Sequence, residues 1–85
     1  MSSCEMLSYN NLSADAFSCL VAAAAKYGVT IATDSGSASS HGFTVAWNYG
    51  RAAQTLTIQC TDSPFWAPCS TINGKINEEV EGCMG

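Results

Sequence analysis

The chain has 85 residues, of which 47% are hydrophobic and 12% charged, and this composition indicates one small folded domain. Three Lys and Arg residues against seven Asp and Glu residues give a net charge of −4, too few cations to bind nucleic acid or an anionic membrane. The longest apolar run, Cys19 to Ala25, is too short to span a bilayer. Because the first residues also lack a secretory signal pattern, a cytoplasmic location is expected by default.

The first predicted element is a helix close to the N-terminus. Residues 1–10 show no apolar period and are expected to be flexible, so that residues 11–85 form a single small α+β domain. Ser13 is a suitable N-cap, apolar residues recur at three- and four-residue steps after it, and Gly28 follows the last of them. These signals predict a helix of about 14 residues between Ser13 and Gly28.

A short strand and a loop are predicted next. Val29 to Thr33 alternates as a strand does, whereas Asp34 to Gly42, with the sequence DSGSASSHG, has the composition of a mobile surface loop. The loop contains the residue types of a hydrolytic triad, in Asp34, several serines and His41. Because no G-x-S-x-G motif is present, a solvated linker is the favoured interpretation.

The segment from Phe43 to Cys60 gives the clearest signal and predicts an amphipathic β-hairpin. Large apolar residues alternate with small or polar ones on both sides of a turn predicted at Gly50 to Ala53. A shift by one residue would scatter the apolar groups over both faces. The expected cross-strand pairs are Phe43 with Cys60, Val45 with Ile58 and Trp47 with Leu56.

A proline-containing link and a second helix complete the chain. Asp62 to Pro68 carries Phe65 and Trp66, which are interpreted as a plug over the core, with an aromatic anchor for a partner as the alternative. Apolar spacing from Ser70 to Glu81 predicts a helix that ends at Gly82. The pair Asn73-Gly74 leaves a hairpin turn as the alternative there.

These elements predict an α+β fold. An N-terminal helix, a three-stranded antiparallel meander and a C-terminal helix are expected in that order, with both helices on one face of the sheet.

Residues 28–76 resemble a group of small, uncharacterised bacterial α+β proteins. The resemblance lies in a tryptophan-bearing hairpin, a DSPF link and a PC-x-x-IN helix start. In the hairpin turn this chain has Arg51 and Ala52, where such proteins often carry Asp-Pro. The group has no assigned activity, so the resemblance implies a fold and no catalytic residue.

The cysteines are five in number and are expected to be reduced in a cytoplasmic protein. Their spacing contains no CxxC pair, and no metal site or cofactor is predicted. Cys60 and Cys69 flank the proline-containing link. Inert packing is favoured for them, with a Cys60 to Cys69 disulfide or a functional thiol as alternatives. Cys69, beside a helix start, is the candidate reactive thiol.

The polar face of the sheet contains no Lys, Arg or Glu. Its predicted members are Thr30, Ala32, Thr44, Ala46, Asn48, Thr55, Thr57 and Gln59. An ordinary threonine-rich surface is one interpretation, and self-association or binding to another protein is the other. The candidate binding residues are Thr44, Asn48, Thr55, Thr57 and Gln59.

The leading functional hypothesis is a non-enzymatic module that binds an unknown protein or forms a weak homodimer. The alternative is a thiol-dependent redox or transfer activity centred on Cys69. No other catalytic residue, and no nucleic-acid or membrane partner, is predicted.

Overall fold

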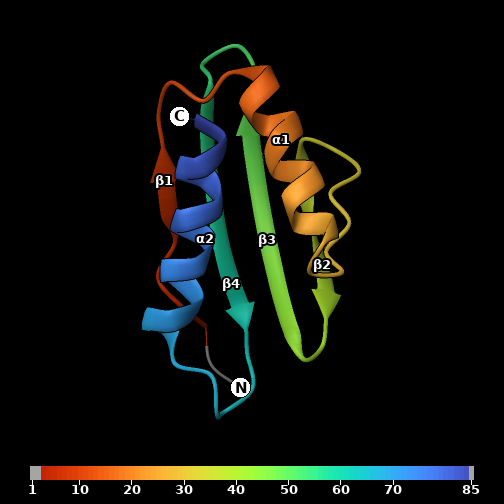
Figure 1. Ribbon diagram of the computed structural model, residues 1–85, viewed down its shortest axis with the longest axis vertical. Coiled ribbons are helices and arrows are strands. Elements are labelled where there is room, and N and C mark those ends of the chain that lie inside the picture. Colours follow the sequence, from red (N-terminus) through yellow and green to blue (C-terminus); the bar gives the residue numbers. More distant parts are fainter. Residues whose placement is uncertain (1–2, 85) are drawn as a thin grey trace.

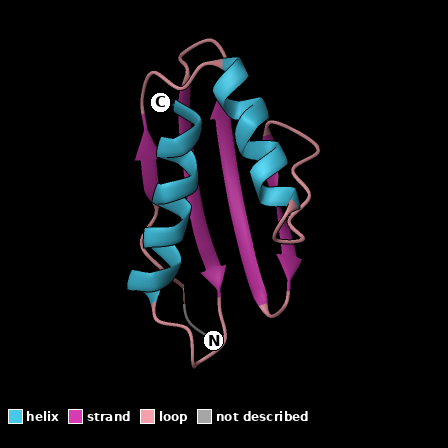
Figure 2. Ribbon diagram, in the orientation of Figure 1, coloured by secondary structure: helices cyan, strands magenta, loops and turns pink. Residues whose placement is uncertain are grey.

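The computed structural model describes residues 3–84 and has an α+β architecture. Two helices cover one face of a four-stranded antiparallel sheet with the strand order β1-β4-β3-β2 (Figures 1 and 2). The strands are β1 (Leu7–Tyr9), β2 (Ser35–Ser40), β3 (Phe43–Gly50) and β4 (Thr55–Asp62), and the helices are α1 (Ala14–Ala25) and α2 (Cys69–Met84). The expected α+β class is confirmed, with four strands where the sequence predicted three.

Strand β1 lies in the segment that was expected to be flexible. Leu7 pairs with Ile58 and Tyr9 with Leu56, so β1 forms one edge of the sheet beside β4. The Cys4 amide also donates a hydrogen bond to the Cys60 carbonyl. This part of the N-terminal segment therefore contains a strand that the sequence did not predict. A strand of three residues is too short to show an alternating pattern, which explains why the sequence did not reveal it.

Strand β2 occupies the segment that was predicted to be a mobile loop. No strand forms at residues 29–33; instead Ser35–Ser40 pairs with β3 along its whole length. The hairpin closes through His41 and Gly42, which both have positive φ angles, of 54° and 86°. Two-residue hairpin turns require this left-handed backbone, which Gly adopts freely and His tolerates better than most residues.

The hairpin of β3 and β4 is present, but its register differs from the prediction by two residues. Val45 pairs with Cys60, Trp47 with Ile58 and Tyr49 with Leu56. The predicted register would have closed on Arg51 and Ala52 in a two-residue turn, which favours Gly or Asn. The structure uses a longer turn, with positive φ at Gln54. A shift of two residues keeps every side chain on its original face, so the apolar pattern could not distinguish the two registers.

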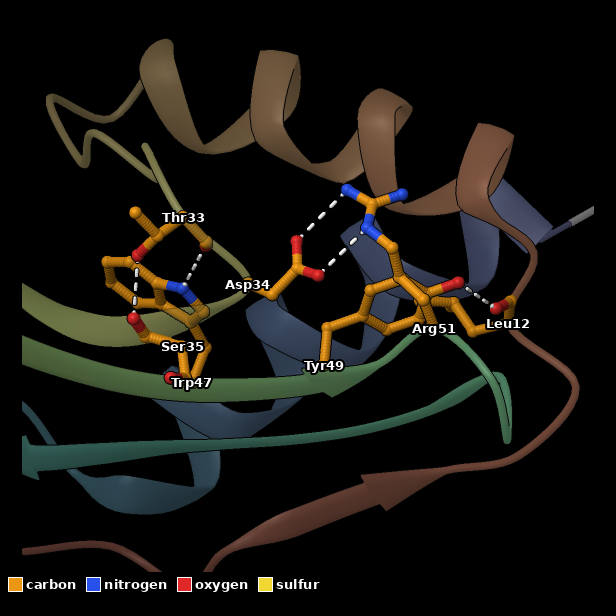
Figure 3. Close-up of polar contacts among 7 residues, drawn as sticks. All are labelled: Leu12, Thr33, Asp34, Ser35, Trp47, Tyr49 and Arg51. Carbon is orange, nitrogen blue, oxygen red and sulfur yellow. Dashed lines mark hydrogen bonds and ion pairs between the residues drawn. The ribbon is translucent and has the colours of Figure 1, made fainter.

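The face of the sheet under the helices forms the hydrophobic core. Trp47 and Tyr49 are buried there, and the Tyr49 ring stacks on Phe17 of α1 with 4.3 Å between ring centroids. The Tyr49 hydroxyl donates to the Leu12 carbonyl at 2.7 Å, and Trp47 Nε1 donates to the Thr33 carbonyl at 2.9 Å (Figure 3). Both polar ends are therefore satisfied inside the core, as buried polar groups require.

The first helix begins as predicted and the second is longer than predicted. The Ser13 side chain accepts a hydrogen bond from the Ala16 amide, which confirms it as the N-cap of α1, and Gly28 follows the helix with positive φ. Helix α2 runs through both Asn73-Gly74 and Gly82. Neither glycine of α2 has a positive φ, so neither terminates the helix.

Two disulfides hold the helices in place. Cys4 is bonded to Cys69 at the start of α2, and Cys19 in α1 is bonded to Cys83 in the last turn of α2. The prediction of reduced cysteines is wrong for these four, and Cys60 is the cysteine that stays free and buried. Because each bond closes more than sixty residues of chain, both reduce the conformational freedom of the unfolded state strongly.

Candidate functional site

The two helices diverge toward the end of the sheet where α1 finishes and α2 starts (Figure 1). An open cleft of about 550 Å³ lies there. Val45 and Cys60 of the sheet line it, together with Leu20 and Ala24 of α1 and Ile72 and Ile76 of α2. The cleft is thus bounded by both helices and by the apolar face of the sheet.

Small side chains and the composition of α2 explain why this space is not filled. Ala24 faces the cleft from α1, and Ala67 faces it from the loop before α2. Val80 is the buried residue of α2, and it packs into the core. Close-packed interiors rarely leave a void of this size. The first half of α2 therefore covers the sheet only loosely.

The rim of the cleft carries one positive and one negative side chain. Lys75 and Glu79, both from α2, line the cleft together with Tyr27 from the segment after α1. A hydrogen bond to Tyr27, and then the charge of Glu78, raise the pKa of the exposed Lys75 ammonium. Lys75 Nζ lies 5.7 Å from the centre of the Tyr27 ring, so this pair reaches across the cleft from one helix to the end of the other.

Cys60 places a thiol in the wall of the cleft. The thiol donates a hydrogen bond to the Asp62 carbonyl at 3.2 Å, and its burial raises its pKa. The protonated thiol therefore predominates at neutral pH, whereas nucleophilic cysteines depend on the thiolate. In this state Cys60 contributes an apolar surface to the cleft.

Cys69, the predicted reactive thiol, is bonded to Cys4. The Cys60 to Cys69 disulfide considered from the sequence is also wrong, because Cys60 is free. A thiolate at Cys69, which the redox or transfer hypothesis requires, is absent from this structure. Pairing with Cys4 could not be inferred from the sequence, since the partners are 65 residues apart.

The aromatic residues of the proline-containing link point largely to solvent. Phe65 is 95% exposed and Trp66 is 65% exposed, so the prediction that they plug the core is wrong. The Trp66 ring contacts Phe43 edge to face, with 5.9 Å between centroids, and lines one end of the cleft. The link therefore forms part of the cleft rim and exposes an apolar tip.

The candidate binding residues lie on one face of the sheet, the face away from the helices. Thr57 is paired with Asn48 on one side and with Ser8 on the other. Thr44 and Thr55 lie on the same face, but Gln59 is partly engaged, since its side chain donates to the Cys4 carbonyl at 2.7 Å. Thr30 and Ala32 are not in a strand, so they do not extend this face. Serines of β2 extend it instead, and Ser39 hydrogen-bonds Thr44 at 2.8 Å.

The triad-like residues of the sequence DSGSASSHG are not brought together. Asp34 forms an ion pair with Arg51 at 2.8 Å, as Figure 3 shows. Ser40 Oγ lies 2.8 Å from His41 Nδ1, at the other end of β2, and it also donates to the Tyr27 carbonyl. A nucleophile activated by an oriented base needs all of its members in one place. These contacts hold the two ends of β2 in place, the Asp34–Arg51 ion pair at its start and the Ser40 hydrogen bonds at its end.

Within residues 3–84, no three His, Cys, Asp or Glu side chains lie close enough together to hold a metal ion. None of the helices in the described part of the chain is long and apolar enough to cross a membrane. Comparisons with protein-family models, with curated proteins and with solved structures found no match. Function is therefore inferred from the geometry of this chain.

Proposed function

We propose that the protein is a non-enzymatic binding module that takes a small, mainly apolar molecule into the cleft between α1 and α2. The observation that supports this is the cleft itself, with its volume of about 550 Å³ and its walls of aliphatic and aromatic side chains. Ligand sites in proteins are typically apolar hollows of roughly 300 to 1,000 Å³ with a few polar groups. The cleft has the size and the chemistry of such a site.

The rim favours a neutral or weakly polar ligand. Lys75 and Glu79 bring opposite charges to the cleft, so neither an anion nor a cation is strongly preferred. Lys75 is exposed and its ion pair with Glu78, at 3.6 Å, is a surface pair of small energetic effect. Affinity would come from removing apolar ligand surface from water, at about 25 cal/mol per Å².

The substitution Ala24→Phe tests this proposal, because it places a large ring in the cleft without changing charge. Titration with Nile red, a neutral dye that fluoresces in apolar surroundings, is expected to show saturable binding to the parent protein. Ala24→Phe is expected to weaken that binding at least ten-fold, roughly the effect of losing 1.4 kcal/mol of binding free energy.

Ala22→Phe is the matched control, since Ala22 is exposed on the same helix and does not line the cleft. This variant should bind the dye as the parent does. Absence of saturable binding by the parent, or equal weakening in both variants, would show that the cleft is not a ligand site.

Self-association through the polar sheet face is a second candidate function. The face is lined by hydroxyl and amide side chains, and the neighbouring edge strand β2 has the uncharged sequence SGSASS. Edge strands without charge or proline readily pair with another chain. Such an interface would include or adjoin the candidate binding residues Thr44, Asn48, Thr55, Thr57 and Gln59.

Thr57→Lys is expected to weaken this association, because it puts a charge in the middle of the face while leaving the core intact. Sedimentation equilibrium of the parent should show concentration-dependent dimers that the variant lacks. A parent protein that remains an 8.9 kDa species up to millimolar concentration would remove this candidate.

The disulfides bear on where the protein acts. Stable disulfides form in oxidising compartments and are rare in the cytosol of most organisms. The bonds Cys4–Cys69 and Cys19–Cys83 therefore support a location in an oxidising compartment in place of the cytoplasmic one expected from the sequence.

A further inference from the structure

The loop of residues 63–68 between β4 and α2 carries the most exposed aromatic residues of the described chain. Phe65 and Trp66, its aromatic tip, lie between Pro64 and Pro68 in the sequence and are exposed. The loop extends past the ends of the strands at one end of the molecule (Figure 1). Large apolar side chains exposed together in this way commonly mark a surface of interaction.

We infer that this loop is a contact surface for a neutral lipid membrane, from which the cleft takes up its ligand. The inference rests on the proposed function, because it gives the apolar ligand a source. It concerns the membrane surface only, since no helix within residues 3–84 could cross a bilayer.

The composition of the loop suits the interfacial region of a bilayer. Residues 63–68, with the sequence SPFWAP, contain no charged side chain, and a charge at this depth would be costly. Trp is the side chain most typical of membrane interfaces, where its ring meets apolar chains and its N–H meets water.

The backbone of the loop also exposes few hydrogen-bond donors. Pro64 and Pro68 have no amide hydrogen, and the Ala67 amide donates to the Pro64 carbonyl at 3.1 Å. The Pro68 carbonyl in turn accepts from the amides of Thr71 and Ile72. Unpaired backbone groups are costly in a lipid environment, and the two prolines and the Ala67 bond reduce their number in this loop.

The size and position of the aromatic tip favour lipid over a folded protein as the partner. Two aromatic side chains offer a few hundred Å² at most, whereas a stable protein interface buries about 800 Å² on each partner. The tip is also continuous with the cleft, because Trp66 and Pro68 line it. A molecule leaving a membrane at this point would reach the cleft along an apolar path.

The net charge of the protein determines whether an anionic or a zwitterionic membrane is the expected partner. A protein with a net charge of −4 is repelled by anionic lipids, so a zwitterionic surface such as phosphatidylcholine is the expected partner. The sequence analysis predicted no membrane partner, on the grounds that the chain is too acidic for anionic surfaces and has no spanning segment. Those grounds do not apply to the surface of a zwitterionic membrane.

Flotation with phosphatidylcholine vesicles tests the inference, with Phe65→Ser as the variant. Phe65 does not line the cleft, so Nile red binding should be unchanged, and Trp66 remains as a fluorescent reporter. Loss of one exposed aromatic ring is expected to weaken vesicle partition on the order of ten-fold. Tryptophan emission of the parent should shift to shorter wavelength when vesicles are added, because Trp66 is exposed in water whereas Trp47 is already buried.

Met6→Ser is the matched control, because Met6 is 52% exposed and lies outside the loop. It should leave vesicle partition unchanged. The inference would be overturned by any of three results: the parent does not bind the vesicles, Phe65→Ser binds them as well as the parent does, or binding depends on added phosphatidylglycerol. If the parent binds Nile red in those cases, the proposed function still stands; if vesicle binding occurs without Nile red binding, the proposed function fails and the loop assignment survives.

Discussion

Replacing Cys19 and Cys83 by serine is expected to lower the free energy of unfolding by about 4 kcal/mol. The bond they form closes a segment with a sequence separation of 64 residues, and the chain-entropy relation gives about 4 kcal/mol for a loop of that size. Domains of this size have a total stability on the order of 5 to 10 kcal/mol. The variant should therefore retain only about 1 to 6 kcal/mol of that stability.

Urea denaturation monitored by tryptophan fluorescence measures this change. Adding dithiothreitol to the parent should lower the midpoint further than the double substitution does, because Cys4–Cys69 is then broken as well. Cys60→Ala serves as control, since Cys60 is unpaired and its loss creates no change in chain connectivity. A parent midpoint that is insensitive to the reductant would contradict the pairing in the structure.

The amphipathic hairpin was the part of the fold that the sequence determined best. Alternating apolar residues from Phe43 to Trp47 and from Leu56 to Cys60 predicted correctly which side chains face the helices. The exact register was not recoverable, because shifts by two residues leave both faces unchanged. The register is decided by the turn of residues 51–54, in which Gln54 has a positive φ angle.

The two edge strands were not predicted, for different reasons. Strand β2 consists of Ser, Gly and Ala, which have low strand propensity and bury little surface. It is therefore held in the sheet mainly by its backbone pairing with β3. The pair His41-Gly42 was the one available signal, since both residues tolerate positive φ. Strand β1 was too short to have a period at all.

The candidate site was beyond the reach of sequence patterns. A cleft depends on how much volume the side chains of two helices leave between them, and this follows from the helix angle as much as from Ala24 or Ala67. The disulfides that hold α2 also join positions far apart in the chain, and an odd number of cysteines allows many pairings. The polar sheet face, by contrast, followed from alternation in β3 and β4, whereas its expected members Thr30 and Ala32 are not in a strand.

Trp47→Ala is expected to lower the free energy of unfolding by about 3 to 5 kcal/mol, the usual effect of removing a buried aromatic side chain. Trp47 is 6% exposed and lies opposite Ile58 and Gly36 in the middle of the sheet. The substitution would also remove the indole N–H that donates a hydrogen bond to the Thr33 carbonyl. Urea denaturation followed by far-ultraviolet circular dichroism measures the change.

Trp66→Ala is the matched control, because Trp66 is 65% exposed and contacts the rest of the protein mainly through Phe43. The same substitution there should change the free energy of unfolding by less than about 1 kcal/mol, as edge-to-face contacts contribute only about that much. Equal midpoints for the two variants would mean that Trp47 is not in the core. In that case β3 would turn its other face to the helices, and Val45 would not line the cleft.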